Sequence, residues 1–219
     1  MQNIFGPVHL PGFERSLVAL VIIGSISISI AQGQSSDELS GDALAIRTML
    51  EDRDRSIKSI LGSSDQITPD QREQLRGLVN DVIDFRAMGE GALGRYWSKI
   101  SEEQQTEFVD VFSQIVRLHS LADTDVYRSG VVYNNVTVNG DEALVHTTTT
   151  YKSIATPVDY TLHKTAAGWL ATDIILDEVS TVKGYARSFQ SVIRKKGFDD
   201  LMVRLNKRLE SERAGAESE

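Results

Sequence analysis

The chain of 219 residues carries 31 acidic and 23 basic residues, a formal net charge of −8, and no cysteine. This acidic balance argues against a surface built to neutralise nucleic-acid phosphates. The absence of cysteine excludes disulfides, thiolate nucleophiles, Cys-ligated metal centres and a lipid anchor on an N-terminal cysteine. A hydrophobic content of 41% is typical of a globular protein that is stabilised by its buried core.

An apolar stretch near the N-terminus, LVALVIIGSISISIA, covers residues 17–31 and is followed by a polar run. As a helix it would span about 22 Å, short of the ~30 Å hydrocarbon core, whereas the apolar region of a secretory signal needs about 7–15 residues. Ser29 and Ala31 are small residues at positions −3 and −1 of a cut after Ala31. We therefore predict a signal peptide over 1–31; a retained membrane anchor is the alternative.

Helical spacing follows this stretch. Apolar residues keep a helical period from Asp42 until Gly62, and Thr68-Pro69-Asp70-Gln71 has the form of a capping box with proline at the first helical position. Another capping box, Ser101-x-x-Gln104, precedes an apolar stripe. The predicted helices cover 42–61, 69–82, 85–93 and 102–120.

The pattern then changes to segments rich in Val, Thr, Tyr and Ile, which predict strands over 131–138, 142–151, 156–165 and 168–178. Asn139-Gly140-Asp141 is a strong hairpin signal, and Ala167-Gly168 marks another turn. Consecutive strands with short connections form an antiparallel meander.

Helical spacing returns after Ser180, is interrupted at Gly197, and resumes over Asp199–Leu209. We therefore predict an α+β fold: a four-stranded antiparallel sheet, covered on one face by helices, with an apolar cavity between them. The predicted organisation is a signal peptide (1–31), one α+β domain (32–209) and a flexible acidic tail (210–219).

Several sequence patterns resemble known catalytic or binding motifs, and each has a structural explanation. Residues 89–94 match G-x-G-x-x-G, but no strand precedes them, so we interpret these glycines as a helix end and a helix–helix corner. No other histidine or carboxylate stands at metal-ligand spacing from His146 or His163 in the sequence. Asp173 and Asp177 are expected to lie on one face of the last strand. We interpret them as polar residues of a solvent-exposed sheet face and not as an acid–base pair. From the sequence we expect a protein that has no cofactor and no catalytic activity.

Two blocks of residues carry a family resemblance. Asp84-Phe85, Ala92-Leu93-Gly94-x-x-Trp97, Ser101 and Phe108-x-x-x-Phe112 form the first. The second runs from Trp169-x-x-x-Asp173-Ile174 through Val179-Ser180-x-Val182-x-x-Tyr185-x-x-x-Phe189 to Gly197-x-x-x-Leu201. In order and spacing they resemble the MlaC-like periplasmic phospholipid-binding proteins, also called toluene-tolerance auxiliary proteins, over roughly residues 42–209.

The chain departs from the family's usual pattern at three places. Glu178 stands where the family usually has glycine, just before Val179-Ser180. Ala186 follows Tyr185, where an arginine is usual, and Arg187 comes one place later. Leu118-His119 replaces a tyrosine late in the 102–120 helix. These differences indicate a divergent branch.

The resemblance implies a periplasmic, monomeric lipid-transport protein whose cargo is a glycerophospholipid. Family members move lipid between an outer-membrane lipoprotein complex and an inner-membrane ABC-transporter complex. This transport is associated with the lipid asymmetry of the outer membrane. From the resemblance and the apolar pattern we predict a cavity lined by Phe85, Trp97, Phe112, Val145, Tyr160, Leu162, Ile174, Val182, Tyr185 and Phe189.

Two alternatives stay open from the sequence. One is an enzyme acting on a small apolar substrate in the same pocket, with His146, Asp173 or Tyr160 as acid–base groups. The other is a non-catalytic module that docks on a membrane complex without carrying lipid itself.

Overall fold

The computed structural model describes residues 41–64, 66–121 and 124–216, which belong to one structural unit. The predicted signal peptide and its cleavage position lie outside these residues. Among the described helices, none is long and apolar enough to cross a membrane.

The first half of this unit is helical, as the sequence predicts. It contains α1 (Gly41–Leu61), α2 (Pro69–Asn80), α3 (Phe85–Leu93), a 3-10 turn η1 (Gly94–Lys99), α4 (Glu102–Ser120) and a second 3-10 turn η2 (Thr124–Arg128). Both predicted capping boxes are confirmed: the Thr68 hydroxyl accepts from Gln71 N, and the Ser101 hydroxyl accepts from Gln104 N.

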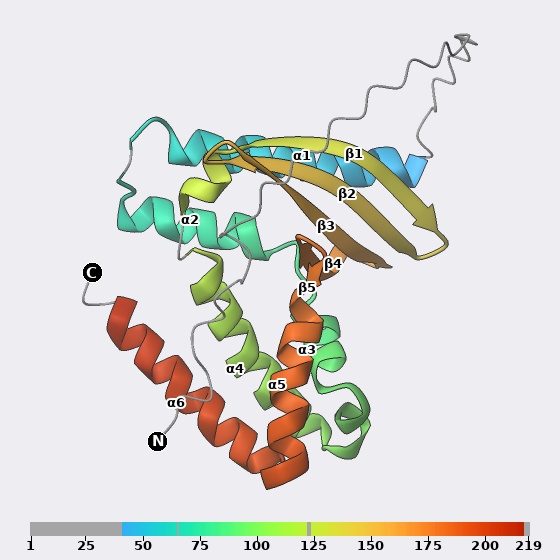
Figure 1. The fold of residues 1–219 in the computed structure, drawn as a ribbon, viewed down its shortest axis with the longest axis vertical. Coiled ribbons are helices and arrows are strands. Elements are labelled where there is room, and N and C mark those ends of the chain that lie inside the picture. The colour runs from blue at the N-terminus through green and yellow to red at the C-terminus, as the bar shows by residue number, and fades with distance from the viewer. Residues whose placement is uncertain (1–40, 65, 122–123, 217–219) are drawn as a thin grey trace, which may run out of the picture. The chain divides into compact units, whose positions relative to one another are not determined.

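The antiparallel sheet follows in chain order (Figure 1). Its strands are β1 (Gly130–Asn139), β2 (Glu142–Tyr151), β3 (Ile154–Thr165), β4 (Gly168–Leu176) and β5 (Val179–Ser180). The prediction of four strands is therefore wrong by one. β5 has only two residues, too few for any periodicity, and a tight turn at Asp177 and Glu178 folds it back onto β4. Asp177 thus lies in that turn, not on the strand with Asp173.

Two helices complete the unit, α5 (Thr181–Lys196) and α6 (Phe198–Ala216), separated by Gly197 with φ +91°. Glycine adopts this conformation without steric cost, so the predicted break is confirmed. α6 continues to Ala216, beyond the Leu209 at which the apolar spacing ends. Glu212, in this extension, accepts a hydrogen bond from Arg208 Nε at 2.6 Å.

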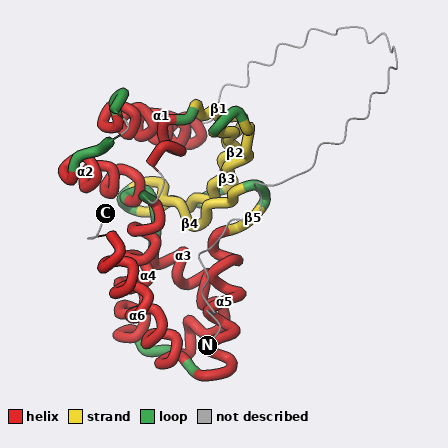
Figure 2. Tube along the Cα trace, turned by 60° about the vertical axis from the view of Figure 1, so that its left-hand side comes forward, coloured by secondary structure: helices red, strands yellow, loops and turns green. Residues whose placement is uncertain are grey.

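The helices meet the sheet in two different ways. α1 lies along one face of the sheet, with α2 beside it, whereas α3, α4, α5 and α6 form a separate group (Figures 1 and 2). α3 begins at the free edge of β4, where Ile83 pairs in parallel with Ala171. Only α1 and the sheet therefore form the helix-on-sheet layer that the sequence predicts.

Candidate functional site

One face of the sheet, called here the inner face, is the face that α1 covers. Val136, Val145, Tyr160 and Ile174 pair in register across four strands and form a single row on it. The next row, towards the β1–β2 turn, is Val138, Ala143, Leu162 and Ala171. Because paired residues point to the same side of a sheet, the inner face presents a continuous apolar surface.

The N-terminal half of α1 packs on this surface. Ala43, Ile46 and Leu50 are buried in one cluster with Val145 and Leu162. An ion pair fixes the start of the helix, since Lys164 Nζ donates to Asp42 Oδ1 at 3.0 Å and thereby lowers the pKa of that carboxyl. The C-terminal half of α1 packs instead on α2, through a second cluster that contains Ile57, Leu61, Leu75 and Leu121.

Three tyrosines lie where the two clusters adjoin. Tyr133 and Tyr160 pack against the first cluster, and Tyr127 packs against the second. Burial raises the pKa of Tyr160 to about 12, and the charge of Asp54 on α1 adds to this shift. Burial also raises the pKa values of Tyr127 and Tyr133, with Tyr160 contributing to both. All three residues nevertheless keep part of their surface accessible.

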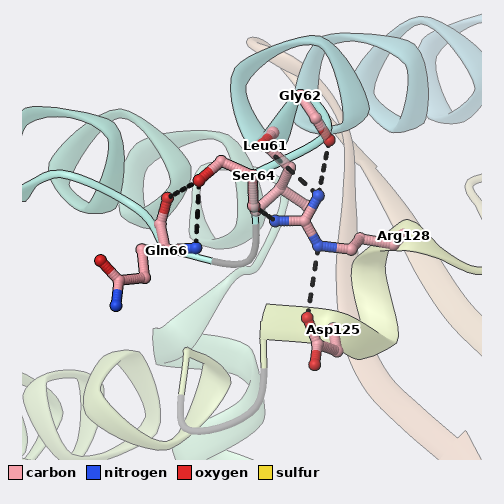
Figure 3. Close-up of polar contacts among 6 residues, drawn as sticks. All are labelled: Leu61, Gly62, Ser64, Gln66, Asp125 and Arg128. Carbon is pink, nitrogen blue, oxygen red and sulfur yellow. Dashed lines mark hydrogen bonds and ion pairs between the residues drawn. The ribbon is translucent and has the colours of Figure 1, made fainter.

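The end of α1 is held by a guanidinium (Figure 3). Arg128, the last residue of η2, donates to the carbonyl oxygens of Leu61 at 3.4 Å and Gly62 at 2.6 Å, and also to that of Ser64. Its Nε pairs with Asp125 at 3.3 Å. The last carbonyls of a helix have no partners within the helix, so Arg128 both satisfies them and links η2, and with it Tyr127, to α1.

The opposite, outer face of the sheet carries several hydrogen-bonded and ion-paired polar side chains. His146 Nδ1 pairs with Asp159 Oδ2 on the neighbouring strand at 3.0 Å. Asp173 accepts from the Ser180 hydroxyl and from Val182 N at 3.0 Å, so its carboxylate supports the first turn of α5. Because His146 and Asp173 lie on this face and Tyr160 on the inner face, the three do not converge, and the acid–base site that the enzyme hypothesis requires is not formed by them.

The structure places the ten predicted lining residues in different environments. Val145 and Leu162 are buried beneath α1, whereas Tyr160 and Ile174 on the same face stay partly accessible. Phe112, Tyr185 and Phe189 belong to an aromatic group with Phe108, in which the Phe112 and Tyr185 ring centroids are 5.0 Å apart. Phe85 and Trp97 each lie under an arginine side chain, and Val182 on α5 lies against Gly91 of α3. Their role as a lipid-binding lining stays a prediction.

The predicted lining leaves out two inner-face residues, Tyr133 and Leu176, and also Tyr127 on η2. Tyr127 and Tyr133 join Tyr160 at the boundary between the clusters, and Leu176 continues the inner face on β4 through its pair with Val158. A register shift between Tyr133 and Asn135 brings Tyr133 to the same face as Val136, which strict alternation does not predict.

The glycines of residues 89–94 confirm the structural interpretation. A Cβ at Gly89 would lie 3.0 Å from a ring carbon of Phe108 on α4, and one at Gly91 would lie 2.8 Å from Val182 Cγ1 on α5. These glycines let α3 approach both neighbouring helices. Among the described residues there is also no group of three or more His, Cys, Asp or Glu able to hold a metal ion.

This architecture, with helices before and after an antiparallel meander and an apolar sheet face under α1, defines an α+β class of protein with an inner face suited to apolar contacts. The family model described as MlaC protein matches residues 52–207. The chain therefore belongs to the MlaC family, and the resemblance found in the sequence is confirmed.

A solved structure supports the fold. A phospholipid-binding protein from Ralstonia solanacearum, in complex with a phospholipid, matches with a TM-score of 0.64 and 23% sequence identity. The match covers 78% of this chain and 98% of that one. Comparison with curated protein sequences gives no match.

Proposed function

We propose that this protein is a periplasmic carrier that holds a glycerophospholipid with its acyl chains against the inner face of the sheet. In this role it moves lipid, as a monomer, between an outer-membrane lipoprotein complex and an inner-membrane ABC-transporter complex. Membership of the MlaC family supports this route, and the phospholipid in the Ralstonia solanacearum structure supports the cargo.

The observation that carries the proposal is the accessible surface that the inner face retains. Tyr160 lies deep enough for burial to raise its pKa to about 12, yet part of its surface stays accessible, as does that of its cross-strand partner Ile174. Surface of this kind is available for contact with the acyl chains of a bound lipid. We infer that acyl chains enter from the boundary between the two clusters, where Tyr127 and Tyr133 also lie.

The energetic argument is direct. Each methylene transferred from water to an apolar environment is stabilised by about 0.8 kcal/mol, so a two-chain lipid cannot cross an aqueous compartment without an apolar container. Charged groups are costly in such a container unless they are paired. The inner-face rows contain none, and the ionisable residues His146, Asp159 and Asp173 lie on the outer face.

Native mass spectrometry of the protein purified from the periplasm tests the proposal. We expect a species heavier than the polypeptide by the mass of one phospholipid, which organic extraction returns to the polypeptide mass. Thin-layer chromatography of the extract then identifies the lipid class. A preparation that arrives without lipid, takes up none from added phospholipid micelles, and keeps its mass on extraction overturns the carrier proposal.

A further inference from the structure

The charged residues of α5 and of the adjoining turn η1 are all basic. α5 contains five basic residues and no acidic one, and η1 contains two basic residues and no acidic one. The remainder of the chain therefore has 16 basic residues against 31 acidic ones, a formal charge of −15, since the whole chain has 23 and 31. One short region thus has a charge opposite in sign to that of the rest of the protein.

The basic residues of α5 are concentrated on its outward side. Lys183, Arg187 and Arg194 follow one another at spacings of four and seven, which places them along one stripe of the helix, and all three are exposed. Together with Ala186, Gln190 and Ser191 they line a shallow, open hollow. The opposite side of α5 is occupied by Phe189 and Val192, which are buried.

η1 extends this basic surface at its side. The Gln190 amide donates to Ala92 O at 3.3 Å, which holds α5 against the junction of α3 and η1. On η1 the Arg95 guanidinium and the Lys99 ammonium lie 5.1 and 5.5 Å from the ring centroid of Tyr96, and both basic side chains are exposed. We call Lys183, Arg187, Arg194, Arg95 and Lys99 the basic face.

Stability of the helix does not account for this arrangement. Cations near a helix C-terminus favour the helix dipole, which explains Arg194 and its two neighbours in the last turn. Lys183 lies in the first turn, where the dipole disfavours a cation, and its spacing of four from Arg187 adds a like-charge repulsion. No residue of the basic face forms an ion pair with a described residue that would offset this cost.

We propose that the basic face docks on the surface of a bilayer that contains anionic phospholipids. Docking interfaces between proteins have a desolvated apolar centre. Here the residues between the cations are Ala186, Gln190 and Ser191, and the exposed large apolar side chains of the described chain lie on other elements. Long, mobile cations without an apolar anchor suit a diffuse layer of phosphodiester anions, which requires no shape complementarity.

This inference goes beyond the proposed carrier role, because it concerns the outside of α5 and does not depend on what the inner face holds. Its consequence is that a protein of net charge −8 approaches an anionic membrane in one orientation, with α5 towards the headgroups.

Vesicle sedimentation tests the proposal on the full mature chain. The vesicles contain phosphatidylcholine alone or phosphatidylcholine mixed with phosphatidylglycerol, each at low and high salt. We expect binding only to the mixed vesicles, and its loss at high salt. One basic residue near an anionic surface strengthens binding about fivefold, so R187E combined with R194E should weaken binding about 30-fold or more.

The matched control reverses two exposed basic residues elsewhere, R72E combined with K207E, and so changes the net charge by the same amount. We expect this variant to bind within about twofold of the wild type. The proposal is overturned if the wild type does not distinguish the two kinds of vesicle, or if both double variants lose binding equally. Bound phospholipid is extracted from the same preparations; unchanged cargo in R187E/R194E separates membrane docking from the carrier function.

Discussion

His163 Nε2 on β3 lies 2.8 Å from Asp84 Oδ2, and the other oxygen of the same carboxylate accepts from Ala87 N at 2.8 Å. Asp84 is the N-cap of α3, and its own amide donates to Ala171 O on β4 at 2.9 Å. One residue therefore connects the sheet that carries the inner face to the helices that carry the aromatic group.

Replacing Asp84 by alanine removes the cap of α3 and the bond to His163 together. We expect D84A to lower the free energy of unfolding by about 1–3 kcal/mol, and H163A by about 1 kcal/mol, because the second change leaves the cap in place. Urea denaturation followed by circular dichroism measures both. The more exposed pair of His146 and Asp159 provides the control, since H146A should cost less than about 1 kcal/mol. An equal loss in all three variants would contradict this account.

The turn between β4 and β5 predicts a stabilising substitution. Glu178 has φ +64°, in the left-handed region that costs about 1–2 kcal/mol for a residue with a Cβ atom. We expect E178G to raise the free energy of unfolding by about 0.5–1 kcal/mol, after the greater flexibility of glycine in the unfolded chain is subtracted. E178A, which removes the carboxylate and retains the Cβ, should give no such gain. Thermal denaturation of the three proteins checks this result.

Neighbouring isoleucines on β4 give a matched test of lipid binding. Ile174 pairs with Tyr160 on the inner face, whereas Ile175 pairs with Asp159 on the outer face. We expect I174W to lower the amount of phospholipid that co-purifies at least fivefold, because the indole fills the space assigned to acyl chains, and I175W to leave it unchanged. Both variants are first checked for a wild-type circular dichroism spectrum. Equal lipid content in I174W and the wild type would place the cargo elsewhere.

Much of this fold could be predicted because its elements have strong local signals. The capping boxes at Thr68 and Ser101 and the hairpin at Asn139-Gly140-Asp141 each fix an element through contacts between residues close in the sequence. The family resemblance, confirmed by the match over residues 52–207, led to the carrier proposal, which no catalytic or metal motif in the sequence could have suggested.

What could not be predicted depends on long-range geometry. The register shift after Tyr133 and another beside Leu162 change which residues share a face, and neither leaves a trace in the alternation of the sequence. The ten predicted lining residues include both inner-face and helix-group side chains, since apolar spacing shows that a residue is buried but not in which cluster. Tyr127 was missed because η2 is too short to show a period.

Arg128 provides a test of how α1 is held over the inner face. Its guanidinium serves carbonyl oxygens of Leu61, Gly62 and Ser64, so R128A leaves several acceptors at the end of α1 without this partner. We expect a loss of about 1–3 kcal/mol in the free energy of unfolding, only partly recovered in R128K because an ammonium lacks the planar fork. Hydrogen exchange of the α1 amides should accelerate in R128A. Unchanged exchange there would show that packing alone fixes the helix.

Tyr160 predicts a stability change at alkaline pH. Burial and Asp54 raise its pKa to about 12 in the folded protein, whereas the pKa of tyrosine in an unfolded chain is about 10. Below a pH of about 10 the phenol is neutral in both the folded and the unfolded state, so Tyr160 adds no pH dependence to the free energy of unfolding. Above it the unfolded state loses the proton first, so the stability associated with Tyr160 falls progressively until the pH passes about 12.

Urea denaturation of the wild type and Y160F across this range isolates the effect, because other titrating groups are common to both proteins. We expect the free energy of unfolding to fall less steeply with pH in Y160F, and the difference between the proteins to level off above about 12. Parallel curves would mean that Tyr160 ionises as easily in the folded protein as in the unfolded chain. That result would place its hydroxyl in bulk solvent, and the deep position assigned to it on the inner face would be lost.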